Sequence, residues 1–396
     1  MARKVFLSFL GVYSYEELNY SSKNKTYRTK FAPVAAIKFL IDIENYMPDT
    51  YYVFVTEKAK KNYEALKNDL KKINFNINNL VQIEIENETH EKKLWDNFEK
   101  VYSVLRKEDQ IVFDITYGFR ATPMLLTTLL NYAKILKHVQ VYKIYYGAYE
   151  KGVDNALIWD LTDFSTIQDL AISTDEFVNY NIPHNFIQFF DENLKEKIRL
   201  FAGMFSTNRS LDIYDGKIAE ELKKELNIAL SSKPNAFNEL KIILETKLSK
   251  FEANEIRNNG LNAVKFCIDA ELIQQAITIL QELIVTIIIL DINEDYKKEA
   301  IRNIVSSVLS IKDKTKIKKE KINTKDLGEQ KIDEILDKTY SLNYKEKLTK
   351  LYIKFSMSVR NDINHAGLRE NPRNSLEFKE KINNYYEKFK DILQFK

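Results

Sequence analysis

The sequence contains very little cysteine, glycine or proline. Cys267 is the only cysteine in 396 residues, which excludes a disulfide framework and any zinc site built from several cysteines. Nine glycines and six prolines, beside 44% hydrophobic residues, argue against extended disorder and for a sizeable core. The length exceeds what one core usually supports, so we expect two domains.

Long apolar runs and a strong net charge are also absent. The longest near-continuous apolar run, residues 283–290, is much shorter than the roughly 20 residues of a membrane helix. The apolar stretch that follows Lys4 is too short for a signal peptide and lacks a small-residue cleavage site. We therefore expect a cytoplasmic protein with no membrane partner. A net charge of +3 does not by itself indicate nucleic-acid binding, so any basic surface must be local.

The common nucleotide-binding loops are missing. The segment 9–13 has one glycine, Gly11, where a dinucleotide-binding fingerprint needs three, and no Gly-Lys-Ser/Thr loop exists. These absences disfavour a nicotinamide-dependent dehydrogenase and a P-loop nucleotidase. Three of the four histidines, His90, His138 and His184, lie near predicted element ends without a set of metal-ligand partners, so we expect no metal site.

The first 165 residues alternate between strand and helix patterns. Strands are predicted at 4–11, 51–56, 80–86, 110–116, 139–146 and 156–161, and helices at 33–47, 57–73, 92–106 and 122–136. Continuous apolar strands separated by helices predict an α/β Rossmann-like domain with a parallel sheet covered on both faces. Ligands bind beyond the carboxyl ends of such strands, so the candidates are Ser8 to Tyr13, Thr116 to Arg120 and Gly147-Ala148.

The strand pattern ends near residue 165, and the rest of the chain predicts an all-α domain. Helical periodicity runs through 185–205, 214–230, 236–256, 261–290, 296–311, 329–339, 344–359 and 375–393.

The fourth strand ends in a segment suited to anion binding. Residues 114–123 read Asp-Ile-Thr-Tyr-Gly-Phe-Arg-Ala-Thr-Pro, in which a strand runs through Thr-x-Gly-x-Arg into a helix that begins near Pro123. Backbone amides and the helix N-terminus would face a ligand there, with Arg120 close by. An ordinary capped turn between a strand and a helix explains the same residues equally well.

A second candidate site lies near the C-terminal end of the sequence. Arg360 and His365 combine a guanidinium cation with an imidazole that can transfer protons, a pair suited to phosphodiester cleavage without a metal. Five residues turn a regular helix by about 140°, so these side chains do not share a face. They converge if the helix unwinds before Gly367 or if two copies meet across a dimer. The alternative is a surface salt bridge of Arg360 and a histidine at a helix C-terminus.

With these segments the chain resembles the CRISPR-associated CARF-HEPN ribonucleases of type III systems, which join an N-terminal Rossmann-like sensor to a C-terminal helical nuclease. In the sensor the resemblance rests on the strand from Lys4 to Gly11, on Tyr27-Arg28-Thr29-Lys30-Phe31-Ala32-Pro33, on Asp114 to Pro123 and on Trp159-Asp160-Leu161-Thr162. At the C-terminal end it rests on Arg360-Asn361-Asp362-Ile363-Asn364-His365, the signature of Arg, four residues and His.

The resemblance implies three parts and two sites. It implies a CARF-like sensor at 1–165, a helical connector at 166–255 and a HEPN-like ribonuclease domain at 256–396. The sensor would bind a cyclic oligoadenylate on a dimer axis, with cyclic tetra-adenylate favoured over hexa-adenylate. The residues expected to touch this activator are Ser8, Gly11, Tyr13, Thr116, Gly118, Phe119 and Arg120.

The second implied site cuts single-stranded RNA without a metal. By the resemblance Arg360 holds the scissile phosphate, His365 transfers a proton, and Asn361 and Asn364 support them. Each subunit of a homodimer, or of a higher oligomer, would contribute one Arg and one His, and activator binding would switch the site allosterically. Two alternatives stay open: a toxin-like HEPN ribonuclease that needs no activator, and a non-catalytic ligand-sensing regulator or RNA-binding module.

Overall fold

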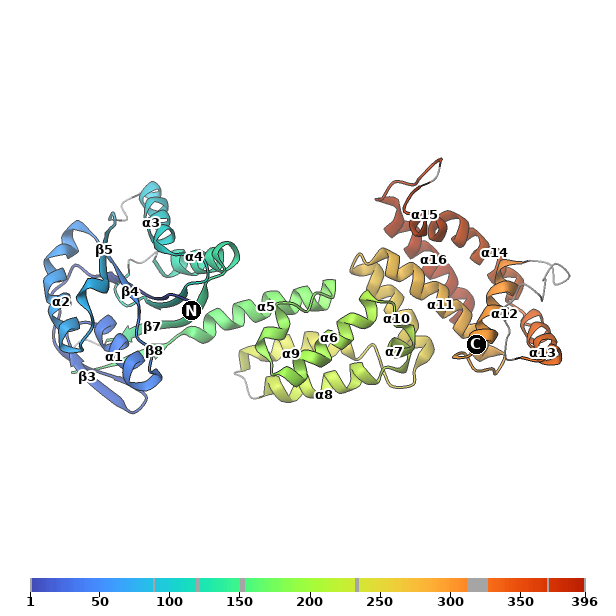
Figure 1. The fold of residues 1–396 in the computed structure, drawn as a ribbon, viewed down its shortest axis with the longest axis horizontal. Helices are drawn as coiled ribbons and strands as arrows, with labels where there is room; N and C mark the ends of the chain where they lie inside the picture. Colours follow the sequence, from blue (N-terminus) through green and yellow to red (C-terminus); the bar gives the residue numbers. More distant parts are fainter. Residues whose placement is uncertain are drawn as a thin grey trace. The chain divides into compact units, whose positions relative to one another are not determined.

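The structure, a computed structural model, describes residues 2–87, 90–118, 122–149, 154–231, 235–311, 327–368 and 370–394. The chain divides into two compact units, residues 1–168 and 169–396 (Figure 1). The first is an α/β unit and the second is helical throughout its described part, which confirms the predicted fold class. The segment 166–255 falls almost entirely in the second unit, together with the C-terminal helices.

One mixed sheet organises the first unit, with strand order β3-β2-β8-β7-β6-β1-β4-β5. Five neighbouring strands form its parallel part, as predicted: β1 (Lys4–Leu10), β4 (Thr50–Val55), β5 (Leu80–Glu84), β6 (Gln110–Asp114) and β7 (Gln140–Ala148). Within this part the chain runs from β1 outward through β4 to β5 at the edge, then returns to β6 on the other side of β1. The strand order therefore reverses between β1 and β6, which is where ligands bind in Rossmann-like sheets.

Three further strands make the sheet mixed. β8 (Asn155–Asp160) is antiparallel to β7, and a hairpin of β2 (Leu18–Ser22) and β3 (Lys25–Thr29) extends the edge beyond β8. This hairpin was not predicted from the sequence. Its two-residue turn begins at Lys23, which has a positive φ of 51°, and its strands bury only alternate residues such as Leu18 and Tyr20. Such short edge strands lack the continuous apolar run that marked the central ones.

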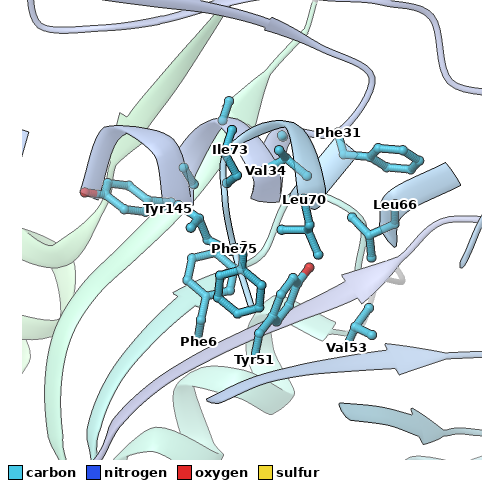
Figure 2. Close-up of a cluster of buried hydrophobic side chains, with 14 of the residues drawn as sticks. Phe6, Phe31, Val34, Tyr51, Val53, Leu66, Leu70, Ile73, Phe75 and Tyr145 are labelled. Carbon is cyan, nitrogen blue, oxygen red and sulfur yellow. The ribbon is translucent and has the colours of Figure 1, made fainter. Parts of the chain in front are cut away.

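Helices cover both faces of the sheet. On one face α1 (Ala32–Glu44) and α2 (Tyr63–Lys72) pack on the aromatic and aliphatic core in Figure 2, which includes Phe6, Tyr51 and Phe75. On the other face α3 (Glu91–Val104) and α4 (Thr122–Lys137) flank a second core that includes Phe9, Phe54 and Phe113. Side chains of β1 alternate between these two cores, as the period of a strand requires.

The observed helices differ from the predicted ones in several places. α5 (Thr162–Tyr180), which follows β8 directly, was not predicted. The single helix expected at 261–290 is two helices, because Glu271 has a φ of 60° and ends the first of them. The helix expected to reach residue 256 ends at Leu248. The remaining helices are α6 (Glu192–Ser206), α7 (Ser210–Asp215), α8 (Lys217–Ser231), α9 (Asn238–Leu248), α10 (Ile256–Asp269), α11 (Ile273–Asp291), α12 (Glu299–Ser310), α13 (Glu329–Tyr340), α14 (Lys345–Phe355), α15 (Asn361–Asn364) and α16 (Glu377–Gln394).

Helix α11 is the central helix of this unit. Among the described residues it alone is long and apolar enough to cross a membrane, judged by length and composition. Most of its apolar side chains are buried, and it packs against α10, α12 and α16. These contacts account for its apolar composition as a core helix.

A buried lysine holds the C-terminal end of α5. Lys247, on α9, donates hydrogen bonds of 2.6 and 2.9 Å to the carbonyl oxygens of Phe177 and Val178. Its ammonium also lies 4.0 Å from the ring centroid of Phe266. The carbonyls of a last helical turn have no partners within the helix, so Lys247 satisfies acceptors that would otherwise be buried and unpaired.

Candidate functional site

The first candidate site lies at the carboxyl edge of the sheet, where β1 and β6 end side by side. Ser8 of β1 pairs with Asp114 of β6, and the two strands then run into separate loops. A Cβ built on Gly11 would lie 3.6 Å from the Cβ of Tyr117, so the two loops are in contact. The structure therefore brings Gly11 and the segment 116–118 together, as the sequence predicted.

Two predicted ligand residues have different surroundings. Ser8 is fully buried, and its hydroxyl forms a 2.6 Å hydrogen bond with the hydroxyl of Tyr51. The side chain of Ser8 is therefore not exposed to a ligand in this conformation, because the pleat of β1 points it into the core, and its contact with a ligand stays a prediction. Tyr13 is 82% exposed, and its carbonyl oxygen accepts a 2.9 Å hydrogen bond from Asn62.

Thr116 ties the loop after β6 to strand β7. Its backbone N–H donates to Oδ1 of Asp114 at 3.0 Å, and its Oγ1 accepts from the N–H of Gly147 at 2.7 Å. Gly147 has no room for a side chain, since a Cβ there would lie 2.7 Å from that of Ala32. Gly118 continues the loop and is partly buried. Phe119 and Arg120, the other two predicted ligand residues, lie outside the described residues.

A buried carboxyl group lies directly beneath this loop. Asp114 is fully buried, and its Oδ2 has no hydrogen-bond partner among the described residues. Burial raises the pKa of Asp114 from 3.8 to about 7, and the hydrogen bonds from Thr116 only partly oppose this shift. The carboxyl group is therefore close to half protonated at neutral pH.

Two tyrosines at this edge were not among the predicted ligand residues. Tyr15 packs between Phe31 and Tyr117, with ring centroids at 4.6 and 4.8 Å, and its hydroxyl accepts a 2.6 Å hydrogen bond from the N–H of Gly11. The hydroxyl of Tyr117 accepts a 3.1 Å hydrogen bond from the N–H of Ala32, the first residue of α1. Nothing in the local sequence pattern indicates that Tyr117 bonds to Ala32 or packs on Tyr15.

The second candidate site lies where α14 gives way to a π-helical turn. The turn, η7 (Ser356–Arg360), runs directly into the short helix α15, so the predicted helix continues five residues further than expected. His365 is the C-cap of α15, and Gly367 follows with a φ of 71°. His365 therefore lies just past a helix end. Inserted π turns are frequent at functional sites because they change the direction of the side chains that follow.

The charge of Arg360 is not neutralised within the described part of the chain. Its only described side-chain partner is Oδ1 of Asn361, at 3.3 Å from Nη1, and its buried Nε has no hydrogen-bond partner there. No carboxylate among the described residues forms an ion pair with it, contrary to the salt-bridge alternative. His365 is exposed, and Asn364 accepts a 3.4 Å hydrogen bond from Gln274 on α11. Arg360 can therefore bind an external anion.

Arg373 fastens the π turn from the loop that follows it, a role that the sequence did not indicate. Its Nε donates to the carbonyl oxygen of Ser358 at 2.5 Å, and its backbone N–H donates to the buried carboxylate of Asp362 at 3.1 Å. The hydroxyl of Ser358 also bonds to that of Tyr385 on α16, at 2.8 Å. These contacts fix the backbone on both sides of Arg360.

No cluster of three or more His, Cys, Asp or Glu side chains suited to a metal ion occurs among the residues that the structure describes. At the second site the groups that can bind or react are the guanidinium of Arg360 and the exposed imidazole of His365. At the first site these are backbone amides, hydroxyls and one buried carboxyl group. The first site suits binding of a polar anion, and the second suits reaction at a phosphate.

Comparison with known proteins assigns the N-terminal unit. Residues 5–150 match the family model described as the CARF domain of the CRISPR system endoribonuclease Csx1. The chain is also 26% identical over 181 residues to the CRISPR-associated protein MJ1674 of Methanocaldococcus jannaschii. That alignment covers 43% of this chain and 28% of the relative, so the chain spans only part of that protein's length. The match identifies residues 5–150 of the N-terminal unit as a CARF domain, and both matches are to CRISPR-associated proteins.

Proposed function

We propose that this protein is a cyclic-oligoadenylate-activated, metal-independent endoribonuclease that cuts single-stranded RNA in type III CRISPR defence. The observation that carries the proposal is the combination of a CARF domain at residues 5–150 with Arg360, which has no ion-pair partner among the described residues, and the exposed His365 just past α15. CARF domains generally bind ligands of the cyclic oligoadenylate type, and the matched family is named for an endoribonuclease.

The proposed reaction needs no metal because RNA carries its own nucleophile. The 2′-hydroxyl attacks the adjacent phosphorus, the bond to the 5′-oxygen breaks, and the products carry a 2′,3′-cyclic phosphate and a 5′-hydroxyl. Arg360 binds the phosphate and stabilises the charge that develops on its oxygens. His365 takes the proton from the 2′-hydroxyl or delivers one to the leaving oxygen. Asn361 and Asn364 are supporting hydrogen-bond groups.

A composite dimeric site supports this chemistry. One chain offers a single Arg360 and a single His365, whereas proton removal and proton delivery each require a group. Two copies related by a two-fold axis supply two of each. The same symmetry places two sensor loops on one axis, so a ring-shaped activator can bias the dimer toward the cleaving state.

The sensor site of the proposal comprises Gly11, Thr116 and Gly118 of the contacting loops, with Arg120 as the expected phosphate-binding cation. Cyclic tetra-adenylate is the activator we propose, ahead of cyclic hexa-adenylate. The amides and hydroxyls at this edge are suited to phosphate and ribose groups.

One cleavage assay tests the proposal. Purified protein is incubated with a fluorescent single-stranded RNA in EDTA, with and without cyclic tetra- or hexa-adenylate. We expect cleavage only with activator, and loss of at least 100-fold in rate for Arg360→Ala and His365→Ala. Arg199→Ala and His184→Ala remove the same residue types from exposed positions and should cleave normally.

The alternatives give different outcomes in the same assay. Cleavage without any cyclic oligoadenylate indicates the activator-independent, toxin-like ribonuclease. Absence of cleavage under all conditions, with ligand binding retained, indicates the non-catalytic regulator. Either result refutes the proposal as stated.

A further inference from the structure

Two backbone amides at the sensor edge are each bound by a tyrosine hydroxyl. The N–H of Gly11, just after β1, donates to the hydroxyl of Tyr15 at 2.6 Å. The N–H of Ala32, the first residue of α1, donates to the hydroxyl of Tyr117 at 3.1 Å. Both tyrosines lie in loops: Tyr15 between β1 and β2, and Tyr117 just after β6.

These two amides are the donors that an anionic ligand would use at this edge. Gly11 follows the strand at which the strand order reverses, and its N–H has no strand partner. Ala32 begins a 13-residue helix whose N-cap residue, Phe31, contributes no side-chain hydrogen bond. A helix N-terminus carries a partial positive charge and unpaired N–H groups, both of which favour a phosphate.

The hydroxyls of the two tyrosines accept hydrogen bonds from these N–H groups without carrying a charge. Burial raises the pKa of Tyr15 and of Tyr117 well above the usual value for tyrosine, so both hydroxyls remain protonated at physiological pH. A neutral oxygen is a weaker acceptor for an N–H group than a phosphate oxygen, whose negative charge about doubles the strength of such a bond. A ligand phosphate can therefore replace either hydroxyl with a net gain.

The side chains of Tyr15 and Tyr117 pack directly against each other. Their rings pack edge to face with centroids 4.8 Å apart and an interplanar angle of 75°, and Tyr15 also packs on Phe31. Tyr15 belongs to residues 11–17, which form no helix or strand, so its side chain can leave without breaking the sheet. Movement of Tyr15 removes packing from Tyr117, and the two amides are freed together.

We propose that the hydroxyls of Tyr15 and Tyr117 are intramolecular competitors for the ligand: they occupy the two anion-binding amides of the empty sensor, and a phosphate-bearing ligand binds by displacing them. The inference rests on the proposed function for the identity of the ligand, and it names the amide donors of that site. It predicts that removing either hydroxyl strengthens binding, the opposite of what a direct ligand contact predicts.

Tyr15→Phe and Tyr117→Phe test the inference because phenylalanine keeps the ring packing and removes the competing oxygen. In Tyr117→Phe the 3.4 Å hydrogen bond of this hydroxyl with that of Tyr20 is lost as well. Binding of cyclic tetra-adenylate to the full-length chain is measured by calorimetry. Loss of one competing hydrogen bond should lower Kd by roughly 2- to 10-fold for each variant. Tyr51→Phe is the matched control, because the hydroxyl of Tyr51 is bonded to Ser8 rather than to an amide. An unchanged or higher Kd for both loop variants overturns the inference.

A second measurement separates this inference from the proposed function. If the wild-type chain binds no cyclic oligoadenylate, the proposed ligand is wrong, and inorganic phosphate then serves as the probe. Labelling with ¹³C-carbonyl leucine and ¹⁵N-glycine selects two amides, because only Gly11 and Gly328 follow a leucine. The Gly11 resonance should respond at severalfold lower phosphate concentration in Tyr15→Phe than in wild type. Identical titrations refute displacement whatever the natural ligand is.

Discussion

Replacement of Asp114 by asparagine should remove a large pH dependence from the stability of the sensor unit. Asp114 is fully buried, and burial raises its pKa from 3.8 to about 7. The folded chain thus holds this proton to higher pH than the unfolded chain does. Stability from this group is complete in acid, falls as the pH rises from about 4 to about 7, and is constant above that. Asparagine cannot ionise, and its Oδ1 can still accept the hydrogen bond from Thr116.

The size of the effect follows from the difference in pKa between the two states. A difference of about three pKa units corresponds to a maximum of roughly 4 kcal/mol, at about 1.4 kcal/mol for each unit. Between pH 5 and pH 8 the wild type should lose on the order of 2–3 kcal/mol of unfolding free energy through this group. The variant should not show this loss. The unfolding free energy of Asp114→Asn relative to that of wild type therefore rises by about that amount between pH 5 and pH 8.

Tryptophan fluorescence during urea unfolding is the suitable assay. The chain has two tryptophans, Trp95 and Trp159, and both lie in the sensor unit, so the signal reports on that unit alone. Asp163→Asn, at an exposed position in α5, controls for the loss of one carboxylate. Parallel curves of unfolding free energy against pH for wild type and Asp114→Asn would refute the reasoning, since they would show that Asp114 is ionised at no cost.

Three further perturbations have expected outcomes. Lys247→Met should leave the carbonyls at the end of α5 unpaired and lower the unfolding free energy by about 1–3 kcal/mol, measured by circular dichroism in urea; an unchanged value would contradict the capping role. Arg373→Gln should loosen the π turn at Ser358 and lower the kcat of RNA cleavage by about tenfold, with little change in RNA affinity, and Arg373→Lys should restore part of the loss. Thr116→Ala should break the bond to Gly147 and raise the activator concentration needed for half-maximal cleavage severalfold, while far-UV circular dichroism stays unchanged.

Much of the fold was predictable because burial leaves a periodic record in the sequence. The strands in the interior of the sheet are buried on both faces, so segments such as β1 and β6 form continuous apolar runs in the sequence. The hairpin of β2 and β3 was not predictable on this basis, because its strands lie at the edge and bury few residues. The break between α10 and α11 was missed because the left-handed residue that makes it, Glu271, is not a glycine.

Some features of the candidate sites could likewise be predicted from the sequence, and others could not. Gly11 and Thr116 were found because the residues that follow parallel strands meet at one edge of the sheet, which follows from strand order alone. The burial of Ser8 was missed, since the face toward which one strand residue points depends on register and packing.

The sequence by itself determined the succession of strands and helices, the position of the sensor loops and the Arg360–His365 pair, because these depend on local periodicity and short motifs. Only the tertiary structure decided which donors those loops offer. The hydrogen bond of Tyr117 with Ala32 and the ring contact of Tyr15 with Tyr117 join segments far apart in the sequence. The π turn likewise depends on Arg373, from beyond α15. Contacts between distant segments depend on how the elements pack against one another. They therefore leave no periodic pattern in the sequence.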